Sequence, residues 1–275
     1  MSRLNSKINP FEAPKNKNVE LTAESGSSNK LLELCLRFGS LMINSGSESA
    51  RTEDSIERIL TAYGVEDASA FCLPTLILVS YKDQEGDLYT SSKRTRDVDN
   101  NFIRLDELNS LSRDLCTGEL KTLSYFENEL NRIENKDINK PQYLLLGIVL
   151  AAFGFNFIFG GDLQNSIGVL ISAGVMGAVY TFLAQLHTNS VFNNFISSFI
   201  GSVIIRSLEY TSLINDASTA SISIIMGLVP GMILTNAIRE ILTKDYTSGL
   251  NKLVESTFIA ISLAMGSALA LLIFK

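Results

Sequence analysis

Residues 225–252 read IMGLVPGMILTNAIREILTKDYTSGLNK, a stretch that starts as an apolar membrane helix and holds a proline between glycines. A helix that spans lipid satisfies its backbone hydrogen bonds internally, and a proline removes one of them. We therefore expect a helix break or hinge at Gly227, Pro230 and Gly231. Interrupted helices of this kind occur at the binding sites of transporters. The alternative is a kinked helix whose glycines let a neighbouring helix approach closely.

The chain divides by composition into a charged part and an apolar part. Of its 275 residues, 46% are hydrophobic and 19% are charged, which is more apolar than an average soluble domain. The segments 141–161, 163–205, 217–238 and 256–274 carry no charged residue. This pattern is typical of a soluble domain followed by a membrane bundle. We predict a mixed fold with a disordered tail (1–28), a cytoplasmic α+β domain (29–140) and an all-α transmembrane domain (141–275) of about five helices.

The membrane topology follows from span length and from the placement of lysine and arginine. Each crossing needs about 20 apolar residues, and most positive charges lie on one side if the N-terminal domain is cytoplasmic. We therefore expect a multi-pass protein of the plasma (inner) membrane with that domain inside the cell. The first thirty residues contain no apolar segment of the kind found in a secretory signal. The expected spans are 142–160, 163–186, 190–208, 217–238 and 253–274.

The charged part alternates helical and strand patterns. Amphipathic spacing predicts helices over 29–45 and 48–63, and β-branched residues then predict a small sheet. Arg51 and Glu53 lie on the polar face of the second helix. That face is either a solvated surface held by pairs of charges one turn apart, or part of a gate or domain contact.

Residue types exclude several classes of function. The single histidine, His187, rules out a multi-histidine metal site and a conventional histidine triad in the charged part. Cys35, Cys72 and Cys116 are scattered in apolar contexts, which fits reduced, structural thiols. The phosphate-binding motif of ATP motors is missing from the sequence, and the net charge of −6 argues against a nucleic-acid partner. We expect no enzyme activity, no cofactor and no metal.

Polar residues in the apolar part are candidates for contact with a solute. Polar groups that face lipid are costly, so Asn193 and Asn194 should face other helices or a wet cavity. His187 lies at the edge of the membrane, where it is either a proton relay or a hydrogen-bonding group at a helix end.

The charged end of the interrupted stretch offers a second set of candidates. Asn236 and Arg239 lie three residues apart on one helix, and the positive charge of Arg239 suits an anionic solute. A helix that begins after Pro230 would also attract an anion to its N-terminus. The alternative for Arg239 is an anchor at the cytoplasmic face, paired with Glu240 or Asp245.

Short motifs in both parts of the chain occur together in the order found in one known family. The most specific are Val229-Pro230-Gly231, the run 234–240, which reads LTNAIRE, and Ser248-Gly249-Leu250. Weaker matches are 41–46 with 51–53, 74–75 with 77–80, 95–96, 105–111, 117–120, 153–155 and 159–161. With these motifs the chain resembles the threonine/serine exporter family, specifically its N-terminal half, over about residues 30–275.

The resemblance implies a secondary transporter that exports small carboxylate-bearing solutes of the threonine and serine type, driven by an ion gradient. Full-length members look like two fused membrane units, whereas this chain is similar to the larger subunit of split systems. The implied partners are therefore the lipid bilayer, a small-molecule solute, and a second small transmembrane subunit or further copies of the chain. In one split system the solute is thought to be succinate, so a succinate or dicarboxylate exporter subunit is the alternative.

A function of another class also fits the division of the chain. The charged domain could act as a regulatory or signalling domain that the apolar part tethers to the membrane. A simple tether needs one span, whereas the sequence predicts five with asparagines inside them. The transporter is therefore the favoured interpretation.

Overall fold

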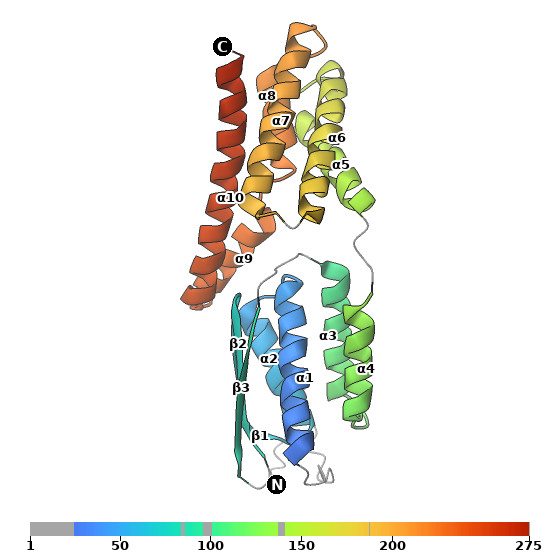
Figure 1. Cartoon of the computed structure of the whole chain (residues 1–275), viewed down its shortest axis with the longest axis vertical. Coiled ribbons are helices and arrows are strands. Elements are labelled where there is room, and N and C mark those ends of the chain that lie inside the picture. The colour runs from blue at the N-terminus through green and yellow to red at the C-terminus, as the bar shows by residue number, and fades with distance from the viewer. Residues whose placement is uncertain (1–24, 84–85, 96–100, 137–140, 187, 275) are drawn as a thin grey trace, which may run out of the picture. The chain divides into compact units, whose positions relative to one another are not determined.

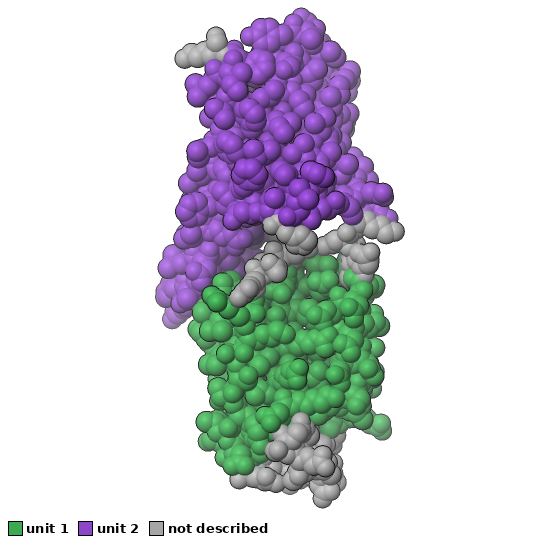
Figure 2. All heavy atoms as spheres, in the orientation of Figure 1, with its two compact units in different colours: residues 1–138 green, residues 139–275 purple. Residues whose placement is uncertain are grey.

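The computed structural model describes residues 25–83, 86–95, 101–136, 141–186 and 188–274. The chain forms two compact units, Met1–Ile138 and Asn139–Lys275, which are called unit 1 and unit 2 below (Figure 2). Each unit has its own core of buried apolar residues.

Unit 1 contains four helices and three strands within its described residues (Figure 1). Unit 2 contains six helices within its described residues. The elements of unit 1 are α1 (Ser25–Asn44), α2 (Ser49–Ala62), β1 (Glu66–Leu73), β2 (Leu76–Lys82), β3 (Leu88–Arg94), α3 (Phe102–Cys116) and α4 (Leu123–Glu134). Those of unit 2 are α5 (Pro141–Ile158), α6 (Leu163–Gln185), α7 (Ser190–Tyr210), α8 (Ala217–Met226), α9 (Gly231–Leu242) and α10 (Tyr246–Ile273).

The sheet of unit 1 is antiparallel with the order β1-β2-β3. Its alternating pattern turns Cys72, Ile77, Val79 and Tyr81 inward, and all four side chains are buried. Helix α1 packs on this sheet, and Phe38 on α1 has no exposed surface. The small sheet that the sequence predicts is therefore present, within a unit that is otherwise helical.

The three cysteines of unit 1 are free thiols. Cys35 and Cys72 are buried, and Cys116 is partly buried. Burial raises the pKa of the Cys35 thiol well above its ordinary value, because a thiolate in the core would lose its hydration. These features fit the structural role that the sequence predicts for the thiols.

Two carboxylates on α2 bind the open edge of the sheet. Glu53 Oε1 accepts a hydrogen bond from Cys72 N at 2.7 Å, and Glu57 Oε1 accepts one from Ala70 N at 3.0 Å. The two glutamates are one helical turn apart, so both reach the same strand. They give acceptors to N–H groups that an edge strand would otherwise expose. The prediction of a solvated face holds for the exposed Asp54–Arg58 pair but is wrong for Glu53, which binds β1.

Unit 2 has the character of a multi-pass membrane protein. In the described residues, four helices are long and apolar enough to cross a membrane, and the bent pair α8–α9 makes a possible fifth span. Helix α10 begins at Tyr246, seven residues before the expected span 253–274, because Asp245 caps it by accepting a hydrogen bond from Ser248 N. The helical half of the predicted fold is confirmed, while the cytoplasmic side of unit 1 stays a prediction.

Helix α7 is joined to its neighbours by small and polar residues. Ser198 donates to Leu263 O of α10 at 2.9 Å, and Ser172 of α6 donates to Gly201 O of α7 at 2.7 Å. A Cβ atom at Gly266 of α10 would lie 2.4 Å from Phe195 O, so glycine is needed where α7 and α10 cross. Close backbone approach supported by serine bonds is the usual basis of helix association in lipid.

The edge contact of unit 1 can be tested by truncating Glu53. The substitution Glu53→Ala removes the acceptor for Cys72 N, and we expect it to lower the free energy of unfolding by about 1–3 kcal/mol. Glu53→Gln keeps an acceptor oxygen and should retain most of the stability. As a control, Asp54→Ala removes only an exposed pair and should change stability by less than about 1 kcal/mol. Urea unfolding of the full chain checks this, and equal losses for Glu53→Ala and Asp54→Ala would contradict it.

The helix crossing of unit 2 can be tested at Gly266. We expect Gly266→Ala to lower stability by about 1–3 kcal/mol, because the added methyl group overlaps the backbone of α7. The matched control is Gly174→Ala on α6, where a Cβ atom would meet no described atom within 4 Å. That change should be neutral or stabilise by up to about 1 kcal/mol through helix propensity. The melting temperature of the two variants in the same detergent distinguishes these outcomes, and a stable Gly266→Ala variant would argue against the crossing.

Candidate functional site

The interrupted stretch forms two helices that meet at an angle of 60°, with the break between Met226 and Gly231. Pro230 lacks an N–H group, and the residue before a proline is disfavoured in the helical conformation, so α8 cannot continue. A new helix starts at once, since Pro230 O accepts a hydrogen bond from Leu234 N at 3.0 Å. The predicted residues of the hinge thus lie at a real change in chain direction.

Close packing requires neither of the two glycines in the break. A Cβ atom at Gly227 would lie 3.4 Å from Ile148 O, which is ordinary van der Waals contact. A Cβ atom at Gly231 would meet no described atom within 4 Å. The end of α8 is therefore explained by Pro230 and not by these glycines.

The bend moves the chain from one group of helices to another. Helix α8 packs against α5, α6 and α7, whereas α9 packs against α10 (Figure 1). Within unit 2, α9 lies at the end where α10 begins. Two segments that would form one straight span are therefore held by different neighbours.

A close backbone contact holds α9 on α10. A Cβ atom at Gly249 of α10 would lie 2.9 Å from Ala237 O and 3.0 Å from Ile241 N. Both of these atoms belong to the backbone of α9 and cannot rotate away. Only glycine permits this separation, so Gly249 sets the distance between the two helices.

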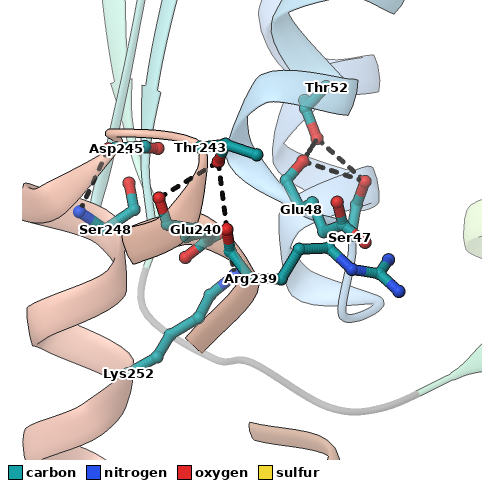
Figure 3. A network of polar contacts seen from close by, with 9 residues as sticks. All are labelled: Ser47, Glu48, Thr52, Arg239, Glu240, Thr243, Asp245, Ser248 and Lys252. Atoms are coloured by element: carbon teal, nitrogen blue, oxygen red, sulfur yellow. Dashed lines mark hydrogen bonds and ion pairs between the residues drawn. The ribbon is translucent and has the colours of Figure 1, made fainter. Parts of the chain in front are cut away.

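A buried ion pair joins α9 to α10 one turn beyond this contact. Lys252 Nζ donates to Glu240 Oε1 at 2.6 Å (Figure 3). The side chains of Lys252 and Glu240 are 12% and 2% exposed, against 20% and 41% for the pair Arg206–Glu209 on α7. Charges this deep are expensive to remove from water, and loss of one partner leaves the other charge uncompensated. The pair therefore links the two helices and places one positive and one negative group side by side between them.

The turn between α9 and α10 surrounds the pair with further polar groups. Thr243 Oγ1 donates to Glu240 O at 3.0 Å, and Asp245 N donates to the same carbonyl at 2.9 Å (Figure 3). Lys244 has a φ of 72°, the left-handed conformation that lets the chain reverse within a few residues. These bonds fix the end of α9 and so the position of Glu240.

The predicted solute contacts on α9 lie on neighbouring faces of the helix. Asn236 is half-buried, and Arg239 is exposed. Glu240, which the sequence offered as a partner for Arg239, points to the buried side and binds Lys252. This helix pair thus carries the exposed Arg239 and the partly buried Lys252 as positive groups.

The predicted contacts on α7 are buried, and they bind neighbouring backbone. Asn193 Nδ2 donates to Tyr180 O of α6 at 3.2 Å, and Asn194 Nδ2 donates to Ser190 O at 2.8 Å. Ser197 donates to Asn193 Oδ1 at 3.3 Å. Helix α10 packs against both α7 and α9, so it is the element that connects the two sets of candidates.

The remaining candidates lie outside this region or outside the described residues. Arg51 is exposed on α2, and Glu53 binds β1, so a role for either in gating stays a prediction. His187, the predicted proton relay, lies outside the described residues. Within the described part of the chain, no group of three or more histidine, cysteine, aspartate or glutamate side chains is placed to hold a metal ion.

The sequence analysis missed the pairing of Glu240 with Lys252, although a signal was present. Lys252 falls three residues after Gly249 and four before Ser256, within the stripe of small residues that forms the buried face of α10. Glu240 follows Ala237 by three residues on the buried face of α9. A charge inside a buried stripe on each of two adjacent helices predicts an ion pair between them.

The apolar helices, the interrupted span and the buried polar groups define a multi-pass membrane protein of the transporter class. The family model described as "Putative threonine/serine exporter" (ThrE) matches residues 33–274. The chain therefore belongs to the threonine/serine exporter family, whose members are membrane transporters and not enzymes.

Three curated relatives cover most of this chain at low identity. "Probable succinate transporter subunit YjjP" of Klebsiella aerogenes is 21% identical over 254 residues, which are 91% of this chain and 96% of that protein. The protein of the same name from Escherichia coli K12 is 22% identical and is covered over 93% of its length. "Probable threonine/serine exporter" of Mycobacterium tuberculosis H37Rv is 22% identical, but only 46% of its length is covered. No solved structure matches the chain.

The contact between α9 and α10 can be tested at Gly249. We expect Gly249→Val to force α9 away from α10, because its side chain would overlap Ala237 O and Ile241 N. The expected loss of stability is about 1–3 kcal/mol, with faster hydrogen exchange in residues 231–242. The control Gly231→Val should leave exchange in α9 unchanged, since that position is open among the described atoms. Equal exchange in both variants would contradict the proposed packing of α9.

Proposed function

We propose that the chain is a subunit of a secondary transporter that exports small carboxylate-bearing solutes of the threonine and serine type, driven by an ion gradient. The observation that carries this proposal is the interrupted span α8–α9 in a chain that belongs to an exporter family. A broken span places helix ends and charged side chains where a polar solute can be bound within a membrane protein.

The chemistry of α9 and α10 suits a solute with a carboxylate. The exposed Arg239 and the partly buried Lys252 supply positive charge, and Asn236 can donate a hydrogen bond on the same helix pair. On this proposal Asn193 and Asn194 line the route along α7, and Gly227, Pro230 and Gly231 form the hinge. Arg51 and Glu53 in unit 1, and His187, keep the gating and proton-relay roles predicted for them.

The relatives support the involvement of a second membrane subunit. The chain covers more than nine tenths of two relatives named as transporter subunits, but less than half of the relative named as an exporter. We infer that a second small transmembrane protein, or further copies of this chain, completes the transport unit. The distribution of lysine and arginine supports a position in the plasma (inner) membrane with unit 1 in the cytoplasm.

Export of succinate or another dicarboxylate is the second candidate function. The names of the two subunit relatives favour it, since both are described as succinate transporter subunits. A membrane-tethered regulatory domain is the candidate from another class. The polar groups buried in unit 2 argue against it, because a tether has no use for asparagines and an ion pair inside its helices.

Efflux measurements test the proposed function. Cells that lack the gene should retain labelled threonine, serine or succinate, and restoring the full chain with its membrane partner should restore export of at least one of them. Pro230→Ala allows a continuous helix and should slow this export. The control is Pro141→Ala at the start of α5, a position where proline is tolerated and its loss should not alter export. Unchanged efflux of all three solutes in the deletion strain would overturn the proposal.

A further inference from the structure

We propose that a zwitterionic α-amino acid binds between Glu240 and Lys252 and separates the two side chains. The carboxylate of the amino acid would then replace Glu240 as the partner of Lys252, and its ammonium group would replace Lys252 as the partner of Glu240. This inference rests on the proposed export function and adds the residues and the charge class of the solute.

The geometry of the pair permits such an exchange. The two charged groups meet at 2.6 Å from different helices, so separating them does not break a bond within either helix. The flexible stem of Lys252 lets its ammonium move, and its side chain keeps 12% of its surface exposed. The Lys252 side chain is therefore not completely closed off from the surface.

The energetics favour a solute that carries both charges. Opening the pair without replacement would take from each charge the opposite charge that it contacts at 2.6 Å, which is unfavourable for groups this little exposed. A zwitterion supplies one carboxylate and one ammonium, so both protein charges keep an opposite partner throughout. A dicarboxylate could bind Lys252, but its second carboxylate would then face Glu240 and be repelled.

The position of the pair would couple binding to the packing of α9. Glu240 and Lys252 join α9 to α10, and Gly249 holds the same two helices together one turn away. A solute bound between Glu240 and Lys252 would increase the distance between these two side chains, while the contact at Gly249 would remain. Amino-acid binding would thus change the inclination of α9, the helix that follows the hinge at Pro230.

Equilibrium binding to the full chain in lipid nanodiscs tests the proposal. Labelled L-threonine should bind, and L-serine should compete with it. Threonine amide lacks the carboxylate and N-acetylthreonine lacks the ammonium, so each should compete at least about tenfold more weakly, as should succinate. Succinate that competes as well as serine would overturn the charge class assigned here. If wild-type chain binds neither threonine, serine nor succinate, the proposed function itself fails, and this inference fails with it.

Variants separate a binding role from a purely structural one. Lys252→Met and Glu240→Gln should each weaken threonine binding at least about tenfold, whereas the control Lys244→Gln should not. The double variant Glu240→Gln/Lys252→Met removes both charges of the pair and should recover the thermal stability that the single variants lose. It should still fail to bind threonine. Recovery of threonine binding together with stability would show that the pair is structural and would overturn the proposal.

Discussion

Inside a membrane, no water is available to form hydrogen bonds with the N–H and C=O groups of a helix backbone. The structure of unit 2 depends on how the chain satisfies these groups at Pro230, where one N–H group is missing. The proline ends α8, and the chain turns by 60° before α9 begins. Because α8 is held by α5, α6 and α7 while α9 is held by α10, the two halves of the interrupted span have different neighbours. Helix α10 also packs against α7, so it links these neighbours within unit 2.

Helix α9 is attached to α10 by two contacts, a close backbone approach and an ion pair whose charges are unfavourable to remove from water. Gly249 brings the helix backbones together, and Glu240 and Lys252 place opposite charges between them. An apolar pair at these positions would hold the helices at least as well, because burial of charges is expensive. The use of charges where leucines would suffice is what favours a function in binding, and the family to which the chain belongs makes a solute the natural ligand.

Much of the fold could be predicted from the sequence, because periodicity and charge-free runs are local signals. The small sheet, the apolar helices and the interruption at Pro230 all follow from residues near one another in the chain. The hydrogen-bond and ion-pair partners of single side chains were harder to predict, because they depend on which faces of the helices and strands meet in three dimensions. Glu53 was assigned to a polar surface but binds β1, and Glu240 was named only as one possible partner of Arg239, whereas its carboxylate accepts a hydrogen bond from Lys252. In both cases the carboxylate faces another element across the fold, which helical spacing alone does not specify.

An amino acid bound at the Glu240–Lys252 pair would contact Lys252, and solid-state NMR can measure that contact directly. With the full chain carrying ¹⁵N-labelled lysine side chains and bound to threonine labelled with ¹³C at its carboxyl carbon, the account predicts dephasing between one lysine nitrogen and that carbon. The signal should persist in Lys244→Gln and be lost in Lys252→Met. Dephasing that survives Lys252→Met, or bound threonine that contacts no lysine nitrogen, would contradict the account.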